Sequence, residues 1–173
     1  MRNLEFKARL EDPNGAIAKA RELGFELWGD LRQTDTYFAV ARGLLKLRET
    51  PTFPAELIFY QREEGADGRP SNYLIARSSD GASLAAVLAE ALGVRANVRK
   101  RRTLFLLDTV RLHLDNVDGL GSFLEIEVPV DGDETEPRRQ LEKLILALGY
   151  DWSDCVRGSY VDLISKDDGR GEA

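Results

Sequence analysis

Cysteine and histidine are nearly missing from this sequence of 173 residues, which contains one of each, Cys155 and His113. A single cysteine cannot form a disulfide within the chain, and it excludes a zinc cluster built from several thiolates. Because nothing indicates a disulfide framework, we expect a cytoplasmic protein. We interpret His113 as a hydrogen-bonded side chain of the interior or the surface rather than as a catalytic base.

Long apolar runs are missing as well. No segment approaches the roughly 18 apolar residues that a membrane-spanning helix needs, so we expect no membrane partner. The first ten residues, MRNLEFKARL, alternate apolar with charged side chains and do not resemble a secretion signal. Phosphate-binding glycine loops of the G-x-x-x-x-G-K-[ST] and G-x-G-x-x-G kinds are absent, which disfavours P-loop and Rossmann nucleotide binding.

Positive charge is in deficit. The chain has 24 Lys and Arg against 30 Asp and Glu, a net charge of −6, which disfavours a nucleic-acid binder. The remaining composition, 43% hydrophobic and 31% charged, is typical of a globular protein. The length fits one domain, which we place at residues 1–165, followed by a flexible tail at residues 166–173.

Caps, turns and apolar periodicity divide the chain into helices and strands. Three helices are predicted at residues 12–24, 83–93 and 135–149, because each has an apolar stripe and ends at a glycine. Strands are predicted near residues 3–10, 35–41, 44–49, 56–62, 72–78, 97–107, 109–115 and 122–129, with a short one near 159–164. An antiparallel sheet of about eight strands tends to close, because closure removes its exposed edges. The predicted fold class is therefore α+β, a closed antiparallel barrel with helices packed outside.

Charged residues recur in steps of two along these strands, opposite apolar faces. In the first strand Asn3, Glu5 and Lys7 share one face, because side chains alternate across a strand. The helices must cover the apolar faces, so the charged faces are predicted to meet inside the barrel. The cations expected there are Lys7, Lys46, Arg48, Arg62, Lys100 and Arg102. The anions expected there are Glu5, Asp115, Glu125 and Glu127.

A charged interior of this kind predicts a ligand. Unpaired buried charges destabilise a fold by several kcal/mol each. The six cations exceed the four anions by two, so the interior lacks negative charge. A polyphosphate would supply that charge, and the arginine guanidinium group matches the geometry of phosphate oxygens. Carboxylates beside such a site are natural ligands for Mg²⁺ or Mn²⁺, which bind one or two carboxylates together with substrate phosphate oxygens.

Short motifs in the same strands resemble the CYTH domain, also called the triphosphate tunnel metalloenzymes. The run Asn3-Leu4-Glu5-Phe6-Lys7 resembles the Glu-x-Glu-x-Lys opening of that family. Further similar segments follow in the family's order at residues 33–38, 45–49, 100–105 and 113–127, the last being the most specific. Residues 159–163 resemble the class IV adenylate cyclase branch, so the resemblance runs from residue 3 to about residue 164.

The resemblance implies an eight-stranded antiparallel tunnel that binds a triphosphate with a divalent metal. It implies metal binding by Glu5, Glu125 and Glu127, and catalysis by Glu5, Lys7, Asp115 and Glu125. The phosphate ligands that it implies are Lys7, Lys46, Arg48, Arg62, Lys100 and Arg102. Asn3 departs from the family pattern, because it stands where the family usually has its first glutamate. An amide oxygen can still coordinate a metal but brings no charge.

Three functions follow from the resemblance. The first is a class IV adenylate cyclase-like conversion of ATP to cyclic AMP and pyrophosphate with Mg²⁺ or Mn²⁺. The second is a triphosphatase acting on tripolyphosphate or an organic triphosphate, and the third is a module that binds a triphosphate without turnover. The partner is thus a nucleoside or inorganic triphosphate rather than a nucleic acid or a membrane, and a homodimer is compatible with the family.

Overall fold

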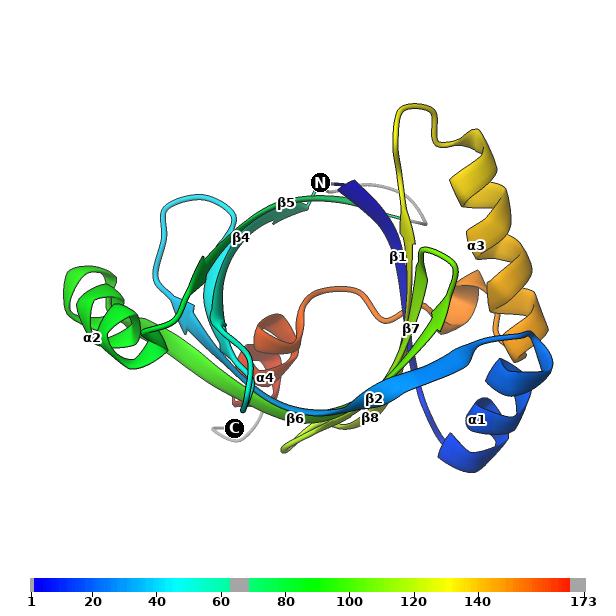
Figure 1. Cartoon of the computed structure of the whole chain (residues 1–173), viewed down its shortest axis with the longest axis horizontal. Coiled ribbons are helices and arrows are strands. Elements are labelled where there is room, and N and C mark those ends of the chain that lie inside the picture. Colours follow the sequence, from blue (N-terminus) through cyan, green and yellow to red (C-terminus); the bar gives the residue numbers. More distant parts are fainter. Residues whose placement is uncertain (1, 63–68, 169–173) are drawn as a thin grey trace.

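The chain forms a closed antiparallel barrel of eight strands, shown end-on in Figure 1. In this computed structural model the backbone is described for residues 2–62 and 69–168, and side chains for residues 2–61 and 72–165. The strands are β1 (Arg2–Arg9), β2 (Glu26–Phe38), β3 (Leu44–Glu49), β4 (Ala55–Arg62), β5 (Arg69–Ser78), β6 (Val94–Leu107), β7 (Val110–Val117) and β8 (Gly121–Pro129). Their order around the barrel is β1-β5-β4-β3-β2-β6-β7-β8. The predicted fold class is confirmed.

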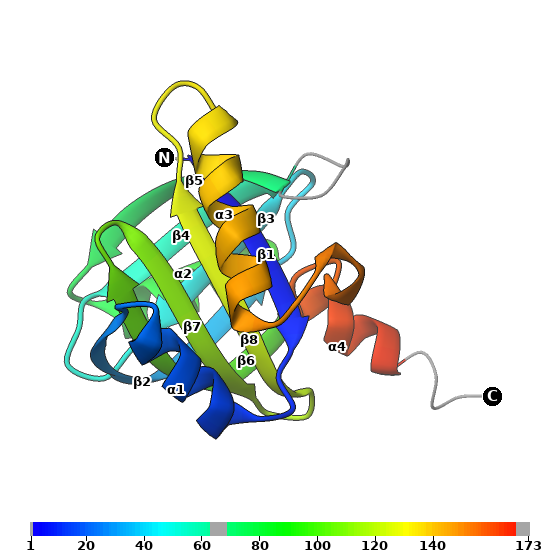
Figure 2. The same ribbon diagram turned by 90° about the vertical axis from the view of Figure 1, so that its right-hand side faces the viewer.

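Helices pack on the outside of the barrel, as expected. The α-helices are α1 (Pro13–Glu22), α2 (Gly81–Leu92), α3 (Thr135–Leu148) and α4 (Tyr160–Asp168), and a 3₁₀ turn spans Trp152–Asp154. Helices α1 and α3 cover one side of the barrel, over β1, β7 and β8, in Figure 2. Helix α2 packs its apolar residues against Phe38 and Leu47 on another part of the wall.

The two faces of each strand separate apolar from charged side chains. On β1, Leu4, Phe6 and Ala8 are at most 1% exposed and join the core under α1 and α3. The opposite face of β1 points into the barrel, where Glu5 and Lys7 stand opposite Glu127 and Glu125 of β8 in the ladder. The apolar faces therefore pack outward against helices and the charged faces pack inward.

The predicted short strand at residues 159–164 is wrong, because this segment begins helix α4. Ser159 is its N-cap: the backbone N–H and Oγ of Ser159 donate to Oδ2 of Asp162 at 2.9 and 2.6 Å. Asp162 N–H lies 3.3 Å from Oγ of Ser159, so the two residues satisfy each other's backbone donors as in a capping box. The helix continues to Asp168, into the stretch expected to be a tail.

Strand β2 is longer than predicted, since it begins at Glu26 rather than near residue 35. Residues 26–30 contain glycine and acidic residues, which are poor strand formers, and most of them are exposed. They are nevertheless held in the sheet by pairing with β6, from Glu26 opposite Leu106 onward, across an irregularity between Leu27 and Gly29. Tertiary pairing therefore overrides local propensity here.

No helix among the described residues is long and apolar enough to cross a membrane. The longest, α3, has 14 residues and carries charged side chains.

The packing of α3 on the barrel makes a prediction about stability. Leu141 is fully buried against the wall, whereas Leu146 on the same helix is 68% exposed. We expect Leu141→Ala to lower the free energy of unfolding by roughly 2–5 kcal/mol, because it removes buried contacts and leaves a cavity. Leu146→Ala is the matched control and should change it by less than about 0.5 kcal/mol. Urea unfolding followed by circular dichroism measures both; equal effects would contradict the packing.

Candidate functional site

The interior of the barrel contains a tunnel cavity of about 380 Å³ with walls formed by all eight strands. The first turn of α4 contributes Ser159 and Tyr160 to its lining. One end is apolar, because Tyr160 and Val161 pack there with Tyr37, Val98 and Phe123. Figure 1 shows α4 lying across the barrel outline at this end. The tunnel therefore has a charged middle and an end filled by aromatic and aliphatic side chains.

Most residues predicted for the site line this cavity. They are Glu5, Lys7, Lys46, Arg48, Lys100, Arg102, Glu125 and Glu127. Asp115 is buried, 1% exposed. It does not line the cavity itself but accepts a hydrogen bond from Arg102, which does. The backbone of Arg62 belongs to β4, but its side chain lies outside the described residues. Eight of the predicted site residues therefore line one cavity, and their roles stay predictions.

Glu125 and Glu127, the acidic side chains of β8, form ion pairs with lysine and arginine side chains. One oxygen of Glu125 lies 3.0 Å from Nζ of Lys7, and the other lies 2.8 Å from Nη2 of Arg102. Glu127 accepts from Nε and Nη2 of Arg111 at 2.8 and 2.7 Å, both through Oε2. Its Oε1 faces the imidazole of His113, at 3.7 Å from Nδ1.

Asn3 also lines the tunnel, beside Arg111 and Glu127. In the amide orientation that gives both ends of Asn3 a partner, its oxygen accepts from Nη2 of Arg111 at 2.8 Å, and its nitrogen donates to the carbonyl of Arg2 at 3.0 Å. Arg111 thus links Asn3 to Glu127 and brings a fixed positive charge to the place where the family pattern has a glutamate.

Two buried aspartates organise the cations at the middle of the tunnel. Asp35 is fully buried and binds Arg48 through two hydrogen bonds of 2.7 and 2.8 Å and Lys46 through one of 2.8 Å. Burial opposes ionisation of Asp35, but these two cations hold its pKa well below the ordinary value. Asp35 is therefore charged and neutralises part of the basic cluster.

Asp115 likewise neutralises buried cations, in this case Arg102 and Lys100 of β6. Its carboxylate accepts from Nε and Nη2 of Arg102 at 2.6 and 2.5 Å and from the hydroxyl of Tyr160 at 3.0 Å. Nζ of Lys100 lies 3.5 Å away. Arg102 and Lys100 outweigh the effect of burial and lower the pKa of Asp115 below its ordinary value. Such an anion is a weak proton acceptor, so Asp115 fixes Arg102 rather than moving protons.

Lys46 and Lys100 lie at the middle of the tunnel, in an environment that disfavours their protonated, charged forms. Burial, reinforced by Arg48, lowers the pKa of Lys46 to about 7. Burial and Arg102 lower the pKa of Lys100 to about 8. Both ammonium groups would gain from an additional anion, because a neighbouring negative charge favours the protonated form.

Three residues of the interior were missed as site residues by the sequence analysis. Asp35 and Arg111 had the correct alternation but were read only as part of a motif or a strand pattern. His113 was expected in the interior or on the surface, but not as a site residue. Over the described tunnel residues, the seven cations are Lys7, Lys46, Arg48, Arg77, Lys100, Arg102 and Arg111. The six anions are Glu5, Asp35, Glu56, Asp115, Glu125 and Glu127. The excess counted over these residues is one positive charge rather than the predicted two.

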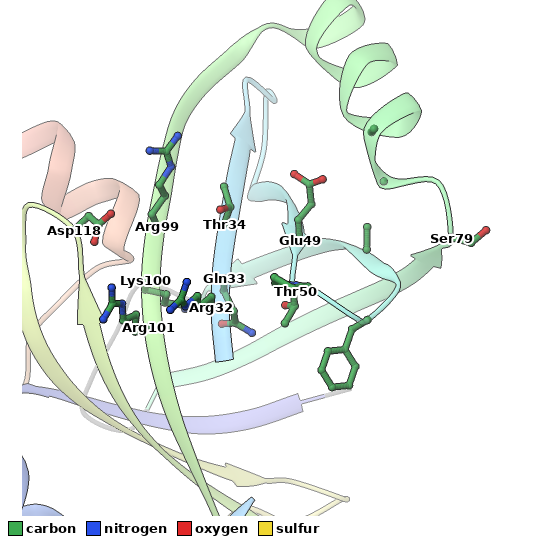
Figure 3. Close-up of a pocket in the computed structure, with 15 residues that line it drawn as sticks. Arg32, Gln33, Thr34, Glu49, Thr50, Ser79, Arg99, Lys100, Arg101 and Asp118 are labelled. Carbon is green, nitrogen blue, oxygen red and sulfur yellow. The ribbon is translucent and has the colours of Figure 1, made fainter. Parts of the chain in front are cut away.

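A second cavity, of about 620 Å³, lies against β2, β6 and the start of α2 and shares Gln33 and Lys100 with the lining of the tunnel. Figure 3 shows Arg32, Arg99 and Arg101 in it, together with Glu49 and Asp118. All three arginines are exposed to solvent, so their charges are screened and require no ligand. The buried charges of the tunnel are not screened in this way, which makes the tunnel the stronger candidate site.

The Asp35 cluster gives a prediction about stability. Asp35→Ala leaves Lys46 and Arg48 without their anion in a buried place, and we expect the free energy of unfolding to fall by roughly 3–5 kcal/mol. Asp30→Ala on the same strand removes an exposed carboxylate and should cost less than about 1 kcal/mol. Chemical denaturation of both variants makes the comparison, and a small loss for Asp35→Ala would contradict the cluster.

The lowered pKa values of Lys46 and Lys100 predict a pH dependence. Unfolded lysines stay protonated up to about pH 10, while the folded lysines release protons above about pH 7 and 8. The unfolded state then binds more protons, so these groups make the protein more stable as the pH rises from 7 to 9.5. The slope is at most about 1.4 kcal/mol per pH unit for each lysine.

Lys46→Met removes one of the two titrating groups and should flatten this slope by up to half. Lys19→Met, on α1 outside the tunnel, is the control and should leave it unchanged. Denaturant unfolding at several pH values between 7 and 9.5 measures the slopes. Parallel slopes for Lys46→Met and the wild type would contradict the assignment.

Comparison with known proteins agrees with this architecture. A protein of Methanocaldococcus jannaschii named "Putative adenylate cyclase" is 24% identical over 186 residues, which cover 94% of this chain and 98% of the relative. The PH1012 protein of Pyrococcus horikoshii OT3 superposes with a TM-score of 0.85 at 23% identity, over 93% of this chain and 98% of that one. Hence the fold is shared along almost the whole length of these proteins.

A third similar structure is from Hippeastrum, a "putative adenylyl cyclase" described as having a dominant triphosphatase activity. It superposes with a TM-score of 0.70 at 17% identity, over 96% of each chain. The model of the CYTH domain family matches residues 1–160, the barrel, the outer helices and the start of α4. The chain therefore belongs to the CYTH domain family.

Proposed function

We propose that this protein is a divalent-metal-dependent enzyme that acts on a triphosphate inside the tunnel. The observation that carries the proposal is the convergence of Lys46, Arg48, Lys100 and Arg102 on two buried aspartates. Those two carboxylates stabilise four cations in a low-dielectric space, and a bound polyanion would supply the remaining negative charge. Arginine forks and lysine ammonium groups are the usual protein ligands of phosphate oxygens.

The donors at the other end of the tunnel fit a divalent ion. His113, Glu125 and Glu127 each offer one atom, and these atoms lie within 4.8 Å of one another. Glu5 is in the same cavity and was predicted as a further carboxylate ligand. A bound divalent ion would neutralise charge on phosphate oxygens and lower the pKa of an attacking hydroxyl or water.

The reaction that we favour is conversion of ATP to cyclic AMP and pyrophosphate. The oxygen of the 3′-hydroxyl forms a bond to the α-phosphorus, the bond from that phosphorus to the bridging oxygen breaks, and pyrophosphate leaves. Lys46, Arg48, Lys100 and Arg102 would bind the β- and γ-phosphates, and Lys7 would lie between phosphate and Glu125. Catalysis would then rest on positioning and electrostatic stabilisation.

The tyrosines of the tunnel favour an organic triphosphate as the substrate. Tyr37, Tyr60 and Tyr73, with Ile58 and Ile75, line the cavity beside the phosphate-binding cations. Such a wall gives a nucleobase an apolar surface, whereas inorganic tripolyphosphate has no use for one. The alternative is hydrolysis of the terminal phosphate of a triphosphate by water, which the description of the Hippeastrum protein supports.

One assay separates these functions. The protein is incubated with ATP or with tripolyphosphate and Mn²⁺, and cyclic AMP, pyrophosphate and phosphate are measured. Cyclic AMP with an equal amount of pyrophosphate supports the cyclase, and release of phosphate alone supports the triphosphatase. Thermal stabilisation by either compound without a product would identify a binding module. No product and no stabilisation would refute the proposal.

Glu125 provides the mutational test of metal-dependent turnover. We expect Glu125→Ala to abolish it, a loss of at least about 10³-fold, because this carboxylate faces both the metal donors and Lys7. Glu125→Gln keeps the size of the side chain and should lose nearly as much activity, which distinguishes lost charge from disturbed packing. Glu136→Ala on the exposed face of α3 is the control. Turnover by Glu125→Gln at the wild-type rate would remove Glu125 from the metal site.

A further inference from the structure

His113 is one of the three donors beside the expected divalent ion, and its surroundings are unusual. The side chain is 3% exposed and projects from β7 into the tunnel. Its Nδ1 atom makes no hydrogen bond to the part of the chain that the structure describes. That atom lies 3.5 Å from Oε2 of Glu125 and 3.7 Å from Oε1 of Glu127.

Neither neutral form of the imidazole is satisfied in this position. If the proton is on Nδ1, a buried donor lacks a hydrogen bond, which costs about 1–3 kcal/mol. If the proton is on Nε2, the lone pair of Nδ1 faces two carboxylate oxygens, and the three acceptors repel one another. A cation placed among the three atoms removes the repulsion and gives Nδ1 the partner that it lacks.

The carboxylate of Glu125 already has partners, because its Oε2 lies 2.8 Å from Nη2 of Arg102 and its Oε1 lies 3.0 Å from Nζ of Lys7. The atom of this group that still lacks a hydrogen-bond partner among the described residues is Nδ1 of His113. Neutral imidazole is the form that binds metals.

We propose that His113 is a metal ligand through Nδ1, together with Glu125 and Glu127, and that this nitrogen makes the site prefer Mn²⁺ over Mg²⁺. The inference rests on the proposed function in that a divalent ion is expected in the tunnel. Metal–ligand bonds of about 2.1 Å place neighbouring donor atoms about 3.0–3.4 Å apart. The observed 3.5 and 3.7 Å are close to that range, and the spread of up to 4.8 Å among the three donors requires the carboxylates to move toward the ion.

The neighbouring residues limit which other groups can join this site. Oε2 of Glu127 is bound by Arg111, and the oxygen of Asn3 accepts from the same guanidinium. Oε1 of Glu127 is the oxygen that remains directed at His113. Arg111 therefore supplies the positive charge on the outer side of Glu127, and the metal belongs on the inner side.

The nitrogen ligand accounts for the expected selectivity. Mg²⁺ prefers oxygen ligands throughout, whereas Mn²⁺ and the later divalent metals bind imidazole more readily. With Asn3 in place of a glutamate, the donor set has one carboxylate fewer than the family pattern, and His113 supplies the missing ligand without adding charge.

Magnetic resonance of bound Mn²⁺ tests the assignment directly. His113 is the only histidine in the sequence, so untagged protein made with ¹⁵N-histidine labels this residue alone. Electron spin echo spectra of the Mn²⁺ complex without nucleotide should show an imidazole ¹⁴N coupling that becomes a ¹⁵N coupling on labelling. Bound Mn²⁺ without a nitrogen coupling would overturn the inference, and so would failure to bind Mn²⁺.

Affinity measurements test the selectivity. His113→Gln should weaken Mn²⁺ binding by about tenfold or more while changing Mg²⁺ binding by less than about threefold. His113→Ala serves as a second variant, and circular dichroism establishes that both are folded. Asn116→Ala, exposed on the same strand, is the control and should leave both affinities unchanged. Equal losses for Mn²⁺ and Mg²⁺ would overturn the proposed preference.

These outcomes are separate from those of the proposed function. A nitrogen coupling in a protein without triphosphate turnover would uphold the His113 site and refute the enzyme. Metal-dependent turnover without a nitrogen coupling would refute the His113 site alone.

Discussion

Ion pairing inside a closed barrel is the constraint on which the rest of this structure depends. Strands with charged inner faces can close around a common space only if those charges neutralise one another. Asp35 and Asp115 meet this requirement in the middle of the tunnel, and Glu125 and Glu127 meet it at the acidic end. The outer faces of the strands are apolar, and the helices outside the barrel cover them.

Incomplete neutralisation gives the tunnel its chemistry. Burial and, after it, the neighbouring arginines lower the pKa values of Lys46 and Lys100, and the carboxylate partners do not offset these effects. The imidazole of His113 shows a different imbalance, because its Nδ1 atom lacks a hydrogen bond to the described residues and lies beside two carboxylates. A phosphate chain suits the first place and a divalent ion suits the second, so one ligand complex can relieve both.

The sequence predicted the barrel and most of its inner face, because strand alternation is a strong signal when both faces have a definite composition. Lys46 with Arg48 and Glu125 with Glu127 show this directly, since each pair is two residues apart. The first part of β2 was not predicted, because its residues have low strand propensity and are held by β6. The start of α4 was misread from its apolar and β-branched residues, although Ser159 and Asp162 carried the capping signal.

Asp35, Arg111 and His113 show a different limit of the sequence. Alternation tells which face a residue occupies, but not which side chains meet across the barrel. His113 meets Glu125 because β7 and β8 are paired in that register, and Asp35 meets Arg48 through the pairing of β2 with β3. The chemistry of the site is set by registers between strands, which a single sequence does not display.

Strand order also has a consequence for how the chain acquires its structure. Strands β2 to β5 and β6 to β8 are each joined to the next strand along the chain, so these parts of the sheet involve contacts close in sequence. Strand β1 instead pairs with β8, where Lys7 stands opposite Glu125, more than a hundred residues away. Loop-closure entropy makes such a pairing slow to form. During synthesis β1 therefore leaves the ribosome before its partner β8 has been made, and the tunnel is complete only when these two strands pair.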